Sequence, residues 1–89
     1  MEPVTLQAVL RETVGKDRDG RFQVSEKKTV SVHLARAAGG LVLHKVQEVF
    51  LGETYVRIET HKGETFFVSF EDVRAIVVEE KEKKAGFGQ

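Results

Sequence analysis

Residues 54–70 constrain the fold of this chain more than any other segment, because they read as two strands joined by a tight turn. Gly63 suits the left-handed third position of a three-residue turn, His61–Lys62–Gly63. The apolar pairs that this turn predicts are Ile58 with Phe66 and Val56 with Val68. A two-residue turn would set Phe66 and Val68 beside charged side chains instead. Since a slip of one residue is costly where one face is buried, we predict the three-residue turn.

The same register turns every second side chain of the hairpin away from the core. The residues predicted to point outward are Tyr55, Arg57, Glu59, Thr65, Phe67 and Ser69. Arg57 and Phe67 become direct cross-strand neighbours, and Tyr55 lies diagonal to Phe67. An arginine over an exposed aromatic ring contributes about 0.5–1 kcal/mol.

We predict that this outward surface binds a partner, because Tyr, Phe and Arg are typical interface anchors. The predicted partner-binding residues are Tyr55, Arg57, Phe67, Lys62 and Phe87. Phe87 stands between two glycines of the C-terminal tail, where it could dock on a partner or a neighbouring subunit. Two simpler interpretations stay open for the hairpin surface: stabilisation of a solvated sheet face, or cover by residues 4–11 or by the tail.

The abundance of valine predicts that the rest of the chain is also mainly β. The chain holds fourteen Val against six Leu and two Ile. Branching at Cβ stiffens the side chain and suits a pleated surface better than a helix. Eight Gly and one Pro supply the turns.

Residues 4–11 fit two structures. Apolar residues alternate at Val4, Leu6, Ala8 and Leu10, as in a half-buried strand. A helical stripe of Leu6, Val9, Leu10 and Val14 fits as well, with Pro3 early and Gly15 just past the end. We favour the strand, because the β-rich remainder offers it partners, and keep the helix as the alternative for residues 4–14.

The next segments alternate turns with short strands. Asp17–Gly20 is predicted to be a turn, Phe22 and Val24 to start a strand, and residues 30–34 to form another. Residues 41–51 are strongly apolar and read as one strand after the turn at Gly39–Gly40. Val46 and Val49 are separated by an odd number of positions, which predicts a β-bulge near Gln47–Glu48. A short helix is the alternative for residues 41–51.

The end of the folded segment predicts one helical turn and a closing strand. Ser69 can cap a single 3₁₀ turn near residues 70–73, and Ala75–Val78 reads as a final strand. Together these elements predict an all-β, mainly antiparallel fold: a small barrel of the SH3-like or Sm-like kind with five to six strands. We expect one domain over residues 1–80 and a charged, mobile tail over residues 81–89.

Charge and cysteine content narrow the classes of function. Lys and Arg total 14, equal to Asp and Glu, and the signs are mixed locally, so charge does not indicate a phosphate-tracking surface. The chain has no cysteine, which excludes disulfides and cysteine-ligated metal. It also lacks the apolar run of a membrane span, so we expect a cytoplasmic protein that does not bind membranes.

No motif predicts catalysis, a metal or a cofactor. The three histidines, His33, His44 and His61, lie at no familiar ligand spacing. Asp17-x-Asp19-Gly20 resembles the start of a calcium loop, but Arg21 and Lys28 occupy positions that need oxygen ligands. We therefore expect neither an enzyme nor a bound cofactor.

Three hypotheses of function follow. The first is a non-catalytic β-barrel that binds a protein partner or assembles with itself, through the hairpin surface or an edge strand. The second is binding of RNA or single-stranded nucleic acid, with bases stacked on Tyr55 and Phe67 beside Arg57 and Lys62. The third is a small ligand-binding or enzymatic barrel, which would need a deep pocket lined by His33 or His44.

Overall fold

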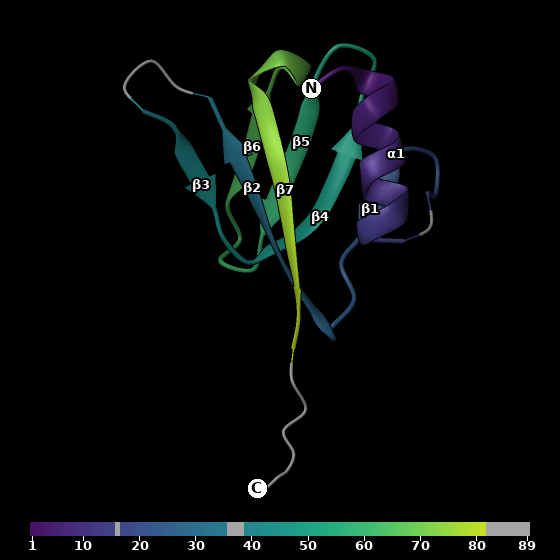
Figure 1. The fold of residues 1–89 in the computed structure, drawn as a ribbon, viewed down its shortest axis with the longest axis vertical. Helices are drawn as coiled ribbons and strands as arrows, with labels where there is room; N and C mark the ends of the chain where they lie inside the picture. Colours follow the sequence, from purple (N-terminus) through teal and green to yellow (C-terminus); the bar gives the residue numbers. More distant parts are fainter. Residues whose placement is uncertain (16, 36–38, 82–89) are drawn as a thin grey trace, which may run out of the picture.

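A computed structural model describes residues 1–15, 17–35 and 39–81 (Figure 1). It contains one α-helix, seven strands and one 3₁₀ turn in these ranges. In chain order the elements are α1 (Pro3–Thr13), β1 (Arg21–Gln23), β2 (Lys28–Leu34), β3 (Leu41–Leu43), β4 (Val46–Leu51), β5 (Val56–Thr60), β6 (Thr65–Val68), η1 (Phe70–Asp72) and β7 (Val73–Glu80). The expectation of a mobile tail falls almost entirely on residues 82–89, which lie outside the described ranges.

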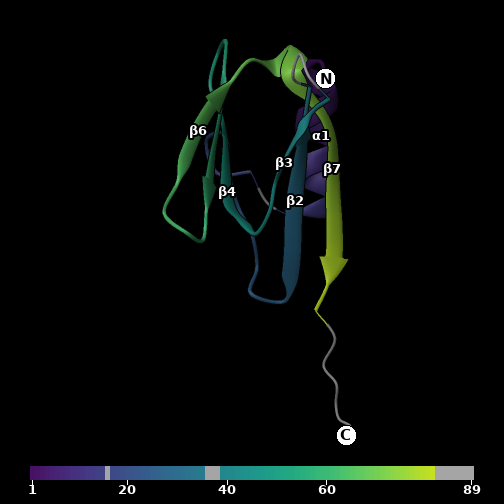
Figure 2. The ribbon, with the colours of Figure 1, turned by 90° about the vertical axis from the view of Figure 1, so that its left-hand side faces the viewer.

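The strands form two antiparallel sheets that face each other (Figure 2). One sheet has four strands in the order β1-β4-β5-β6, and the other has three in the order β3-β2-β7. The predicted mainly antiparallel β fold is therefore confirmed. Strands outnumber the five to six that we predicted, because residues 41–51 divide into two strands.

The hairpin of β5 and β6 adopts the predicted register. Val56 pairs with Val68, Arg57 with Phe67 and Ile58 with Phe66. Gly63 has a φ of 85°, and the Thr60 and Gly63 amides close the turn by donating to the Glu64 and Thr60 carbonyls. The left-handed glycine is what allows a three-residue turn, and this turn sets the parity of both strands.

The preference for a strand over residues 4–11 was wrong, and the helical alternative is correct. Leu6 and Leu10 are fully buried in α1, whereas Val4 is 69% exposed. A strand would have placed Val4 on the same side as these leucines. The helix ends at Thr13, and Gly15 follows just beyond it, with an amide that donates to the Leu10 carbonyl and a φ of 133°.

The prediction of one strand over residues 41–51 was also wrong. The chain leaves the three-stranded sheet after β3, turns at Lys45 with a φ of 53°, and enters the four-stranded sheet as β4. The predicted bulge is confirmed, since the register against β5 shifts between Val46 and Glu48. The bulge allows Val46 and Val49 both to face the core.

The predicted turn at Asp17–Gly20 and the predicted 3₁₀ turn are both present. Asp19 and Gly20 both have positive φ. They lie between Arg18 and Arg21, whose backbone amides each donate to the other's carbonyl, as in a type I′ turn. Hydrogen bonds from the Gly20 amide and from Gln7 hold the pKa of Asp17 below its ordinary 3.8. The 3₁₀ turn forms as predicted, but Ser69 makes no side-chain capping bond.

A single apolar core lies between the sheets and α1. Its buried members are Leu6, Leu10, Val14, Phe22, Val30, Val32, Leu34, Leu43, Val46, Val49, Val56, Ile58, Phe70 and Val73. Because α1 and both sheets contribute, the helix is an integral part of the core rather than a cover on the outer surface of the hairpin. The one helix of the described ranges is too short to span a membrane.

Candidate interaction surface on the four-stranded sheet

The structure brings three of the predicted partner-binding residues together on the solvent side of the four-stranded sheet. Phe67 is 66% exposed and Tyr55 is 38% exposed, with their ring centroids 5.8 Å apart. Arg57 pairs directly with Phe67 in the β5–β6 register. The prediction that these side chains share one outward surface is therefore confirmed at the level of geometry.

Phe50 of β4 completes this surface, which we call the aromatic face: Phe50, Tyr55, Arg57 and Phe67. Phe50 pairs with Arg57 across β4 and β5. The arginine stacks on this ring, with Cζ 4.8 Å from the centroid, and Tyr55 lies 6.3 Å from it. Sequence reasoning missed Phe50 because residues 41–51 were interpreted as one strand, which left the pairing of β4 with β5 unspecified.

A row of polar residues runs beside the aromatic face and fixes Arg57. Arg57 Nη2 donates to Glu48 Oε2 at 3.1 Å, and Arg57 Nε lies 3.7 Å from Glu59 Oε2. Gln23 of β1 in turn donates to Glu48 at 3.5 Å. The side chains of Arg57 and Glu48 are only 23% and 11% exposed. The guanidinium is thus held in one orientation and its charge is neutralised locally.

The ring of Tyr55 packs against the backbone of Gly52. The Gly52 amide donates to the Tyr55 carbonyl at 2.8 Å, which closes the turn between β4 and β5. A Cβ on Gly52 would lie 2.6 Å from Cζ of Tyr55, so the ring rests directly on the glycine backbone. A side chain at this position would displace the ring, and the tyrosine is therefore positioned by the local sequence.

The remaining predicted partner-binding residues lie elsewhere. Lys62 is exposed in the β5–β6 turn, at the opposite end of the hairpin from Tyr55. Phe87 lies outside the described residues. Residues 4–11 form a helix that packs into the core and leaves Phe67 open, so the interpretation that they cover the surface is wrong.

The edge of the four-stranded sheet adjoins the aromatic face. β6 is the last strand in the order β1-β4-β5-β6, and it carries Phe67. Its four residues contain no charged residue and no proline, the two features that often protect an edge strand from pairing with another chain. A partner could therefore contact the rings and the strand backbone together.

The histidines do not gather into a site. His33 lies on β2, His44 precedes the turn at Lys45, and His61 follows β5. In the described ranges, no group of three or more His, Cys, Asp or Glu residues is arranged to hold a metal ion. No metal chemistry follows from these side chains.

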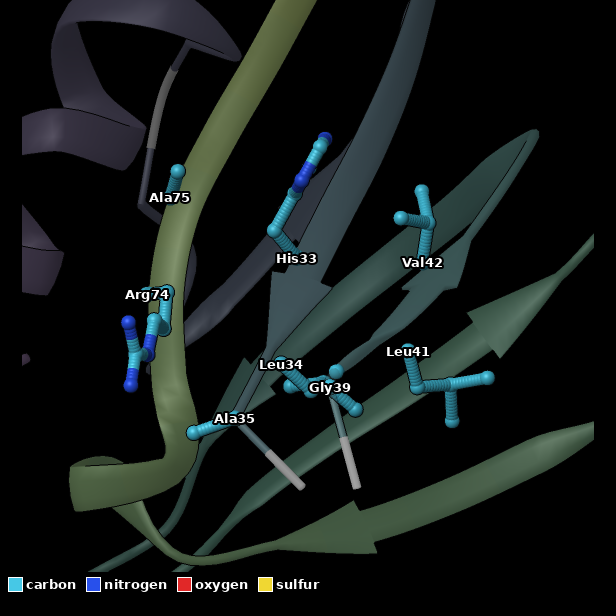
Figure 3. Close-up of a pocket in the computed structure, with 9 residues that line it drawn as sticks. His33, Leu34, Ala35, Gly39, Leu41, Val42, Arg74 and Ala75 are labelled. Atoms are coloured by element: carbon cyan, nitrogen blue, oxygen red, sulfur yellow. The ribbon is translucent and has the colours of Figure 1, made fainter. Parts of the chain in front are cut away.

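A hollow of about 650 Å³ on the three-stranded sheet contains His33 (Figure 3). His33 and Arg74 are the ionisable side chains in its lining, and they extend from β2 and β7 in different directions. General acid–base or nucleophilic catalysis needs a second group within hydrogen-bonding reach. The described residues that line the hollow supply none.

No family model, curated protein or solved structure matches the chain.

Proposed function

We propose that the chain is a non-catalytic binding or assembly module that takes a protein partner, or a second copy of itself, on the aromatic face. The observation that supports this is the exposure of Phe67 and Tyr55 beside an arginine that is already fixed in place. Aromatic residues and arginine dominate the energetics of protein interfaces. The SH3-like or Sm-like barrel stays our proposed class for the fold.

Preorganisation strengthens the case for binding. Tyr55 rests on Gly52, and Arg57 is held by Phe50 and Glu48, so neither side chain has to be ordered by the partner. Ordering a flexible side chain at an interface costs about 0.5–1.5 kcal/mol. The aromatic face therefore keeps more of its contact energy as affinity than a surface of mobile side chains would.

Nucleic-acid binding on the same rings has less support. The charge of Arg57 is neutralised by Glu48 and Glu59, and both carboxylates would lie close to a bound phosphate backbone. Lys62 is too far along the hairpin to replace that charge beside Tyr55. Binding of single-stranded RNA that weakens with added salt and is lost in Phe67→Ala would restore this alternative.

The proposal is tested with Phe67→Ala and a matched control. Val77 is 40% exposed on β7 of the other sheet, so Val77→Ala removes an exposed apolar side chain away from the aromatic face. We expect light scattering after size exclusion to detect self-association, or affinity capture from the native cell to identify a partner. In either case Phe67→Ala should weaken the interaction at least tenfold, and Val77→Ala should not.

The opposite result is equally clear. A parent protein that stays monomeric, together with the same captured partners for the parent and for Phe67→Ala, would refute the aromatic face as a binding surface. Circular dichroism of both variants checks that the fold is intact. Loss of an exposed ring is not expected to unfold the domain, since Phe67 makes little contact with the core.

A further inference from the structure

The fold collects positive charge at a place that the sequence does not reveal. A hollow of about 390 Å³ lies among four segments: the start of β2, the turn before β4, the residue after β5 and the residue after β7. The start of β2, the β3–β4 turn, the β5–β6 turn and the end of β7 all lie toward the lower end of the two sheets in Figure 1. The ionisable residues that line the hollow are Lys28, Lys45, His61 and Lys81, and we call it the lysine hollow.

Two backbone hydrogen bonds and one side-chain hydrogen bond connect the segments that carry these residues. The His61 amide donates to the Lys45 carbonyl at 3.0 Å, and the Lys81 amide donates to the Lys27 carbonyl at 2.8 Å. Lys28 Nζ donates to the Thr13 carbonyl at the C-terminal end of α1, at 2.9 Å. The basic residues therefore come from separate parts of the chain but line one hollow, with the Lys28 ammonium group held at the end of α1.

The charge in the lysine hollow is not balanced by its lining. No Asp or Glu lines it, although the chain as a whole is neutral. The ion pairs formed within the described ranges involve Arg11 and Arg57, and none of the three lysines takes part. Basic side chains that line one hollow without a carboxylate create a positive potential there, and this potential attracts an anion.

The backbone of Lys45 is a second, independent observation. Within the described ranges only Asp19 and Lys45 have a positive φ without being glycine. Asp19 belongs to an Asp-Gly turn, for which this conformation is ordinary. Lys45 has no such motif, and a left-handed conformation costs a non-glycine residue roughly 1–2 kcal/mol. A lysine where glycine would be easier suggests that its side chain serves a purpose.

We propose that the lysine hollow binds the phosphate group of a small phosphate monoester or of inorganic phosphate. A terminal phosphate carries about −1.5 to −2 charges near pH 7 and has three acceptor oxygens, which suits a hollow lined by basic residues from different segments. Thr29 also lines the hollow, and a threonine hydroxyl group can donate a hydrogen bond. A phosphodiester within a nucleic-acid strand carries a single charge and fits a confined hollow less well.

The test is a titration of the ¹⁵N-labelled chain, followed by NMR at low ionic strength. The probes are sodium phosphate, a nucleoside monophosphate and an oligonucleotide without a terminal phosphate, with sodium chloride as the control for ionic strength. We expect the first two probes to cause saturable shifts at the amides of Lys28, Lys45, His61 and Lys81. The oligonucleotide should bind at least tenfold more weakly.

Three variants make the result specific. Lys45→Gln combined with Lys81→Gln should weaken phosphate binding at least tenfold. Lys62→Gln should change it less than twofold, because Lys62 is exposed next to His61 but does not line the hollow. Lys45→Gly should also lose binding while its unfolding temperature stays at or above that of the parent, which separates loss of the site from loss of the fold.

Any of three results would overturn the proposal. One is the absence of saturable shifts with phosphate and with the nucleoside monophosphate at millimolar concentrations. Another is an equal loss of affinity in Lys62→Gln and in Lys45→Gln with Lys81→Gln, which would indicate diffuse attraction to surface lysines. Oligonucleotide binding as tight as that of the monophosphate would likewise replace the phosphate site by a nucleic-acid surface.

Discussion

At the scale of single residues, the ion pair of Glu48 and Arg57 does more than connect two strands. Glu48 is only 8% exposed although it lies on the solvent side of the sheet, because Arg57 and Gln23 pack around it. Arg57 Nε already lacks a hydrogen-bond partner, so the loss of Glu48 would leave the guanidinium poorly satisfied. The pair thus keeps Arg57 in the aromatic face at some cost in desolvation.

We expect Glu48→Ala to lower the free energy of unfolding by about 1–3 kcal/mol, since it leaves a mostly buried charge without its best partner. Glu53→Ala is the control, because Glu53 is exposed in the turn between β4 and β5 and should change stability by less than about 0.5 kcal/mol. Urea unfolding measures both. Equal effects of the two substitutions would show that the ion pair contributes nothing specific.

The direction of side chains was predicted correctly in β5 and β6, where the length of the turn decides which residues point outward. Gly63 fixed the length of the β5–β6 turn, and the turn fixed which side chains of β5 and β6 point outward. Prediction failed for Phe50 and Glu48, because their partners lie on β5 and the pairing of β4 could not be derived from local spacing. Residues 52–55 join these strands by a turn whose length the sequence analysis did not predict, so the register of β4 against β5 stayed open.

At the scale of elements, α1 shows why a spacing of four residues is ambiguous. Leu6, Leu10 and Val14 satisfy a strand of period two and a helix of period 3.6 equally well. The residues that distinguish the two structures are Val4 and Ala8, which a strand buries and the helix exposes. The β-rich composition therefore favoured a strand without being able to exclude the helix.

The helix is expected to contribute strongly to stability through its buried face. Leu10→Ala should lower the free energy of unfolding by about 2–5 kcal/mol, because it opens a cavity in the shared core. Val4→Ala should change it by less than about 0.5 kcal/mol, since Val4 is 69% exposed. Thermal or urea unfolding gives both values. A Leu10→Ala variant as stable as Val4→Ala would mean that α1 is only loosely attached.

The chain passes from one sheet to the other between β3 and β4, and the sequence did not predict this change. An apolar run of eleven residues suggested one strand, and the bulge was placed correctly within it. The transfer between sheets was not predicted, because it depends on the backbone of Lys45 rather than on hydrophobic pattern. Lysine is not a residue that indicates a left-handed turn.

At the scale of the whole molecule, one core joins the helix to both sheets. Leu6 of α1, Ile58 of the four-stranded sheet and Val32 of the three-stranded sheet belong to the same buried cluster. We therefore expect a single unfolding transition, with coincident midpoints by circular dichroism and by NMR signals of methyl groups in each sheet. Loss of the β3-β2-β7 methyl signals before those of the other sheet would contradict this.

Folding determines which charged residues lie near one another, and the sequence alone did not show this. Balanced totals and locally mixed signs correctly indicate a neutral chain, but they do not indicate which charges meet. In three dimensions Arg57 lies beside two carboxylates, whereas three lysines line a hollow without any. One evenly mixed sequence therefore produces an aromatic face whose arginine is neutralised and a hollow whose lysines are not.

The place of Tyr55 on the aromatic face also has an optical consequence. Tyr55 is the only tyrosine, and the chain has no tryptophan, so the ultraviolet emission of the protein comes almost entirely from this one ring. A partner that covers Phe67 and Tyr55 would change that emission without any added label. Phosphate in the lysine hollow, at the other end of β5, would leave it unchanged. The molecule thus carries its own reporter for one of its two surfaces.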